Sequence, residues 1–94
     1  MEAVLWGVRG GIPGPAKTNQ FYGANTTCVE LRLEEGPLLI FDGGTGIRLL
    51  GKTLPERGVC HVCISHGHTD HTQGLCFFQP FYQPGWTVHL YVPE

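Results

Sequence analysis

The sequence predicts one small α+β, or layered α/β, domain that spans residues 1–94. Strand-like apolar runs come first along the chain and helical spacing is inserted later, an order typical of these fold classes. The chain has ten aromatic residues, and only 15% of its residues are charged, which excludes a disordered protein. Fourteen glycines and seven prolines further indicate tight turns between short elements.

The first half of the chain predicts three strands. The apolar run 3–8 indicates a buried strand, and the glycine- and proline-rich stretch 9–25 indicates a long loop. Partial alternation over 26–33 predicts a half-exposed strand. A turn at 34–37 should then pair it in a hairpin with the apolar run 38–41, a central strand.

The second half alternates helical and strand-like patterns. Apolar residues at i, i+3 and i+7 over 47–54 predict a short amphipathic helix, closed by a proline. The run 59–65 predicts another strand, and 66–71 a loop. We expect a short helix or turn over 72–82, and a last strand over 87–92.

The charge balance and the lack of targeting signals limit the function classes. Six basic and eight acidic residues give a net charge of −2, which argues against a dedicated nucleic-acid module but leaves open a phosphate-containing substrate held by a metal. The sequence has no apolar stretch of about 18 residues and no secretory signal pattern. We therefore expect no membrane association, a cytoplasmic location and free cysteines.

The segment Cys60-His61-Val62-Cys63 has the C-x-x-C spacing of redox and metal motifs. It lies within a strand-like run, where residues i and i+3 point to opposite faces. The two thiols should therefore be small hydrophobes rather than partners in one site.

The most informative segment is His66-Gly67-His68-Thr69-Asp70-His71. Imidazole and carboxylate groups suit zinc, iron or manganese, and Gly67 allows a turn that points His66 and His68 the same way. Asp70 and His71 follow closely enough to bind a second metal, and paired metals suit hydrolysis of phosphodiesters or amides. The alternative is that these are solvated histidines and that Asp70 caps a helix beginning near His71.

This hexad resembles the H-x-H-x-D-H signature of the metallo-β-lactamase superfamily. Four further segments resemble, in order, motifs of one branch: G-V-R-G-S-I-P at 7–13, Y-G-G-N-T-S-C at 22–28, D-A-G-T-G at 41–46 and Q-G-[LF]-P-F-F at 74–78. The branch is the one that resembles ribonuclease Z and class II cyclic-nucleotide phosphodiesterases.

The resemblance implies the N-terminal half of an αββα sandwich and a metal-dependent hydrolase, most readily of phosphodiester bonds. His66 and His68 would hold a first zinc, and Asp70 and His71 a second, with manganese or iron as other candidates. Asp70 would also be the catalytic residue that orients or deprotonates the metal-bound water.

The resemblance also implies supporting roles. Asp42 would fix the ligand loop by hydrogen bonds, the alternative being a helix N-cap. Arg9 would meet substrate phosphate, the alternative being a solvated loop cation. Asn25 is interpreted as a turn residue, and His61 and His89 as packed or surface histidines.

The family pattern has a further histidine, a bridging aspartate and a final histidine after the hexad, and here only His89 follows. Both zinc sites would be incomplete, so we expect weak metal binding, no activity in the isolated chain and an apolar sheet face without a partner. The chain is then the first part of a longer enzyme, a half-domain that pairs with a second chain or with itself, or a non-catalytic truncated fragment. An iron-containing oxidative or thioester-cleaving relative is a further alternative.

Overall fold

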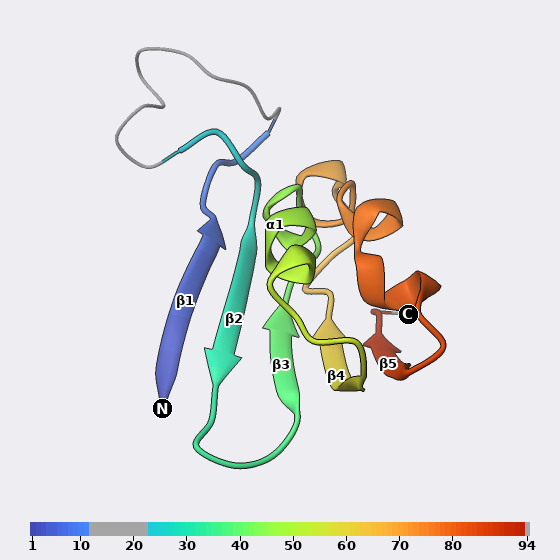
Figure 1. The fold of residues 1–94 in the computed structure, drawn as a ribbon. Coiled ribbons are helices and arrows are strands. Elements are labelled where there is room, and N and C mark those ends of the chain that lie inside the picture. Colours follow the sequence, from blue (N-terminus) through green and yellow to red (C-terminus); the bar gives the residue numbers. More distant parts are fainter. Residues whose placement is uncertain (12–22, 94) are drawn as a thin grey trace.

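The computed structural model describes residues 1–11 and 23–93, whose five strands form one mixed sheet in sequence order (Figure 1). The first three strands pair antiparallel, and the last three pair parallel. The structure therefore confirms a small α+β domain. The strands are β1 (Glu2–Gly7), β2 (Cys28–Arg32), β3 (Leu38–Phe41), β4 (Gly58–Cys63) and β5 (Trp86–Tyr91).

The helical segments are short, and in Figure 1 they lie on one side of the sheet. Helix α1 (Gly46–Lys52) connects β3 to β4 and ends two residues before the predicted boundary, with Thr53 as its C-cap. The Thr53 hydroxyl donates to the carbonyl of Leu50 over 2.7 Å. The segment expected to be a helix or turn over 72–82 forms two 3-10 turns, and the proline within it has no N–H to continue a helix. The three 3-10 turns are η2 (Thr69–His71), η3 (Leu75–Phe77) and η4 (Gln79–Tyr82).

The predicted hairpin between β2 and β3 is confirmed, with Gly36 at a φ of +108° in its turn. The long loop expected over 9–25 is described only at its ends, since residues 12–22 lie outside the described residues. These ends are adjacent: the Arg9 N–H donates to the Asn25 carbonyl over 3.0 Å, and Arg9 also forms an isolated bridge with Thr26.

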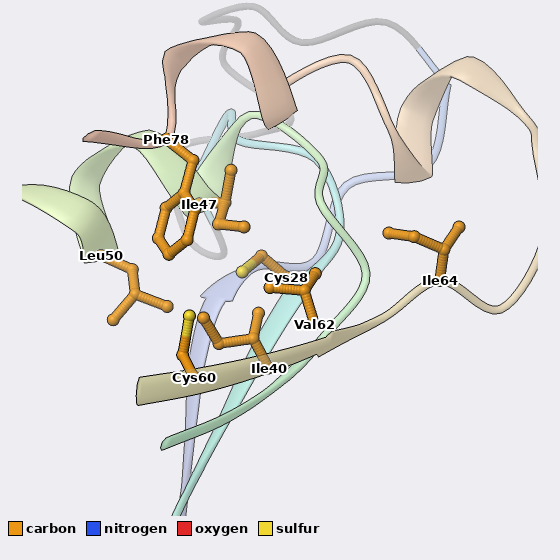
Figure 2. Packing of buried hydrophobic residues seen from close by; sticks show 8 residues of the cluster. All are labelled: Cys28, Ile40, Ile47, Leu50, Cys60, Val62, Ile64 and Phe78. Atoms are coloured by element: carbon orange, nitrogen blue, oxygen red, sulfur yellow. The ribbon is translucent and has the colours of Figure 1, made fainter. Parts of the chain in front are cut away.

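The hydrophobic core lies between α1, the 3-10 turns and one face of the sheet (Figure 2). Burial raises the pKa of the Cys28 thiol to about 12, with nearby carboxylates adding to the shift, and burial raises that of Cys60 to about 11. Cys63 lies on the other face of β4, so the two cysteines of the C-x-x-C segment do not share a site, as predicted. The buried hydrophobic residues are Cys28, Ile40, Ile47, Leu50, Cys60, Val62, Ile64 and Phe78.

The opposite face of the sheet, here called the open face, is formed by the alternate residues of all five strands. Within residues 1–11 and 23–93 no helix packs on it, and Leu5, Phe41 and Val59 are 65%, 41% and 44% exposed. The open face comprises Ala3, Leu5, Val29, Leu31, Leu39, Phe41, Val59, His61, Cys63, Thr87, His89 and Tyr91.

None of the helices in the described part of the chain has the length and hydropathy needed to cross a lipid bilayer.

Candidate functional site

Two loops meet where the parallel strands β3 and β4 end. Phe41 pairs with Cys63 in the last register position of these strands, and the Asp42 N–H continues the contact by donating to the Cys63 carbonyl over 2.8 Å. The loop after β3 begins with Asp42, and the loop after β4 carries the histidine hexad. The carboxyl ends of adjacent parallel strands are a common place for binding sites, because both loops leave the sheet toward the same space.

Asp42 is the link between the two loops. Its carboxylate accepts hydrogen bonds from the Ser65 N–H over 2.7 Å and from the Ser65 hydroxyl over 2.9 Å. The residue is buried, and its φ of +68° lies in the left-handed region, which aspartate tolerates better than most residues. The N-cap of α1 is Thr45, so the alternative role of Asp42 as a helix cap is wrong.

The electrostatics of Asp42 favour its ionised form. Burial opposes ionisation, but the hydrogen bonds from the backbone and hydroxyl of Ser65 and the contact with His71 outweigh it, so the pKa of Asp42 lies below its ordinary value. Asp42 is therefore an acceptor-only carboxylate at neutral pH.

The negative charge on Asp42 determines which ring nitrogen of His66, the first histidine of the hexad, carries the proton. The Ser65 hydroxyl has one proton, and ionised Asp42 takes it, so the Ser65 Oγ accepts in its contact with His66 Nδ1, 2.9 Å away. The proton of neutral His66 then lies on Nδ1, and Nε2 keeps the lone pair that a metal requires. The sequence reasoning assigned no role to Ser65. The position of Ser65 between a buried strand and the first histidine was the feature of the sequence that could have indicated its role.

The three imidazoles of the hexad lie together. The ring centroid of His66 is 4.5 Å from that of His68, in an edge-to-face contact, and 4.1 Å from that of His71. Three of the four predicted ligands, His66, His68 and His71, therefore lie beside one another.

The His71 ring lies between two carboxylates. Its Nδ1 is 2.9 Å from Oδ2 of Asp42, but the approach is poorly directed for a hydrogen bond. Its Nε2 is 3.3 Å from Oδ2 of Asp70. Two carboxylates on one imidazole create a negative potential that favours a cation at this position.

Asp70 is tied to the glycine-rich loop as well as to His71. Its Oδ2 accepts from the Gly11 N–H over 3.3 Å. Desolvation opposes its ionisation, but this hydrogen bond and the neighbouring imidazoles of His71 and His68 outweigh desolvation and lower the pKa of Asp70. The N-cap of η2 is His68, without a side-chain cap, so the alternative role of Asp70 as a helix cap is wrong.

Backbone contacts hold the two loops at a fixed spacing. The Gly43 N–H donates to the His71 carbonyl over 2.7 Å, and the Gly74 N–H donates to the Gly43 carbonyl over 2.8 Å. A Cβ at Gly44 would lie 2.4 Å from the Asp70 carbonyl oxygen, so only glycine fits here. Gly67 differs from its expected role: it has no left-handed φ, and a Cβ there would meet nothing within 4 Å.

A hydroxyl network, which the sequence reasoning missed, supports the loop after β3. The buried Thr26 hydroxyl accepts from the Thr45 N–H over 2.8 Å and from the Gln73 side chain over 3.0 Å. The Thr45 hydroxyl also contacts Oδ1 of Asn25 at 3.2 Å, so Asn25 has a structural partner, in line with its interpretation as a turn residue. Threonines that lie far apart in the sequence have no spacing pattern from which such a network could be predicted.

The remaining histidines lie away from the hexad, on the open face. His61 is half-buried and His89 is exposed, which matches their interpretation as packed or surface histidines. Their rings stack with centroids 4.6 Å apart, and His61 Nδ1 is 2.8 Å from the Tyr91 hydroxyl.

The groups at the strand ends are of the types that bind a divalent metal, but too few of those in the described residues converge on one point. Imidazoles beside carboxylates are suitable ligands, and the carboxylate of Asp42 lies 2.9 Å from Nδ1 of His71. Yet among residues 1–11 and 23–93 no group of three or more histidines, cysteines or carboxylates is placed to hold a metal ion.

Comparisons of the chain with protein-family models, with curated proteins and with solved structures find no match.

Proposed function

We propose that this chain is the metal-loop half of a metal-dependent hydrolase of phosphodiesters, related to the ribonuclease Z-like branch of the metallo-β-lactamase superfamily. Its sheet and helices would form the N-terminal half of an αββα sandwich. The observation that carries the proposal is the His71 ring between the carboxylates of Asp42 and Asp70, beside two further imidazoles. The two carboxylates orient this imidazole and create a negative potential that favours a bound cation.

The ligands follow from the donor set. His66 and His68 would hold one zinc, and Asp70 and His71 the other, with manganese or iron as alternatives. Catalytic zinc commonly has three protein ligands, so each position needs a ligand beyond these pairs. When bound, the metal supplies Lewis acidity to a phosphoryl oxygen and lowers the pKa of water.

The chain's own residues have separate tasks in this proposal. Asp42 fixes the orientation of His71 and, through Ser65, the proton on His66. Asp70, ionised at neutral pH, accepts the proton of the attacking water. Arg9 lies next to Thr26 at the same end of the sheet and would contact the substrate phosphate.

Zinc titration of the chain, followed by calorimetry and by NMR of the imidazole nitrogens, tests the proposal. We expect weak binding that perturbs His66 and His68, and its loss when His66, His68 and Asp70 are all replaced by alanine. The matched control replaces His61 and His89, which lie on the open face, and should bind zinc like the parent. Zinc binding that survives the triple replacement would contradict the proposal.

Turnover of bis-p-nitrophenyl phosphate with added zinc or manganese tests the chemistry. We expect no turnover by the isolated chain, because both metal positions lack ligands. If the isolated chain hydrolyses this substrate and the triple variant does so equally well, the assigned residues are not the site.

A second candidate is a non-catalytic half-domain that functions only with a partner. The uncovered apolar open face favours it. Size-exclusion chromatography with light scattering separates the two: a well-folded monomer that binds zinc at the hexad counts against the half-domain.

A further inference from the structure

A groove of about 650 Å³ lies at the end of the sheet opposite the histidine hexad. Its lining includes Leu38, Gly58 and Trp86, which are the first residues of β3, β4 and β5, whereas the hexad follows the other end of β4. Since β4 has six residues at about 3.3 Å each, about 20 Å separates the groove from the candidate metal site. A ligand of the groove is therefore a second ligand, distinct from a substrate at the hexad.

The wall of the groove that carries Trp86 is held from several directions. The indole N–H donates to the Pro55 carbonyl over 2.9 Å, and the Gly58 N–H donates to the Gly85 carbonyl over 3.1 Å. A Cβ on Gly58 would lie 2.7 Å from the nearest indole carbon, so glycine lets the ring pack directly against the β4 backbone. The indole is thus in place before a ligand arrives, and a preformed wall lowers the entropic cost of binding.

The lining combines apolar walls with a single ionised group. Leucine, valine, proline and tryptophan side chains supply most of it, and Arg57 is the only arginine, lysine, aspartate or glutamate among the described residues that line the groove. Small-molecule sites are typically apolar clefts of about 300–1,000 Å³ with a few polar groups that orient the ligand. The groove has this size and composition.

The guanidinium of Arg57 is available to a ligand. No carboxylate among residues 1–11 and 23–93 forms an ion pair with it, and the residue is exposed. The acidic residues next to the lining segments, Glu34, Glu35 and Glu56, are also exposed and do not line the groove. A guanidinium binds a carboxylate through two parallel hydrogen bonds. A phosphate monoester carries nearly two charges at neutral pH and would suit a site with more than one cation.

We propose that this groove binds a small aromatic carboxylate, whose flat apolar body lies against Trp86 and whose carboxylate pairs with Arg57. Stacking on an aromatic ring favours a flat ligand over an aliphatic one of the same area. His61 is a further polar group of the lining, and its Nδ1 is already engaged, 2.8 Å from the Tyr91 hydroxyl. Binding here needs neither a metal at the hexad nor a cover on the open face, so it stands or falls separately from the proposed hydrolase.

Titration of the metal-free chain with naphthoate, followed by NMR of the backbone and indole N–H groups, tests the site. We expect saturable binding that shifts the signals of the Trp86 indole and the Gly58 N–H and leaves those of His66 and His68 in place. Naphthamide has the same flat body without the charge, and it should bind about five- to tenfold more weakly.

Two arginine variants separate the charge from the apolar walls. Arg57→Gln should weaken naphthoate binding about five- to tenfold and leave naphthamide binding unchanged, which also shows that the groove is still folded. Arg48→Gln replaces an exposed arginine of α1 and is the matched control, which should bind naphthoate like the parent. Absence of saturable binding at millimolar naphthoate overturns the proposal. So do equal affinities for naphthoate and naphthamide, or an Arg57→Gln variant that binds naphthoate as tightly as the parent.

Discussion

The strand ends of β3 and β4 and the open face of the same sheet differ in how their side chains are held. At the strand ends, short hydrogen bonds join Ser65 to Asp42, and the His71 ring lies 2.9 Å from the same carboxylate. On the open face, strand register sets the positions of the side chains, and the polar contacts of His61 lie at its β4–β5 end. Removing one polar atom should therefore destabilise the strand ends. On the open face, the overall residue composition should matter more than any one side chain.

The largest effect is expected from Asp42→Ala at the strand ends. This change removes the acceptor of the Ser65 N–H and hydroxyl and puts alanine at a φ of +68°. We expect the free energy of unfolding to fall by about 3–4 kcal/mol. Urea denaturation measures it. Asp42→Asn keeps an acceptor oxygen and tolerates the backbone, so an equal loss in both variants would contradict this account.

The next largest effect on stability is expected at Gly44, with Gly67 as the matched control. Alanine at Gly44 would force its Cβ against the Asp70 carbonyl and Thr26, at a cost of about 2–3 kcal/mol, while alanine at Gly67 meets nothing and should change stability by no more than about 0.5 kcal/mol. Thermal and urea unfolding of both variants check the difference. Equal destabilisation by the two replacements would show that the loops are not held at the spacing described.

Acid should weaken the strand ends selectively. The pKa of Asp42 is lower in the folded chain than in the unfolded chain, where it is about 3.9. The stability that Asp42 contributes is therefore complete above that unfolded value and is lost as the pH falls through the folded one. From pH 5 downward, the parent should lose more stability than Asp42→Asn. Unfolding measured at several pH values tests this, and parallel pH profiles would argue against it.

Local patterns predicted most of the fold. Apolar runs and the turn before Leu38 located all five strands, because strand period and turn chemistry act over a few residues. They also predicted that Cys60 and Cys63 lie on opposite faces. The segment 72–82 was less certain, since the choice between a helix and 3-10 turns depends on packing against α1 that no local pattern contains.

The candidate site shows the same contrast between what local sequence patterns reveal and what depends on folding. The histidine hexad was visible because its residues are adjacent in sequence. Ser65 and the Thr26–Thr45–Gln73 network were not, because their roles depend on two loops meeting at the strand ends. The expected function of Gly67 was inferred from residue type alone, and the close backbone approach occurs at Gly44 instead.

The smallest effects compare the two faces of one strand. Val62 is fully buried against α1 and the 3-10 turns, whereas Val59 lies on the open face. Val62→Thr buries an extra hydroxyl and should cost about 1–2 kcal/mol, while Val59→Thr should stay within about 0.5 kcal/mol. Urea unfolding of both variants measures the difference, because only the Val62 side chain has neighbouring groups on all sides. Equal losses of stability at the two positions would show that the open face is packed as tightly as the core.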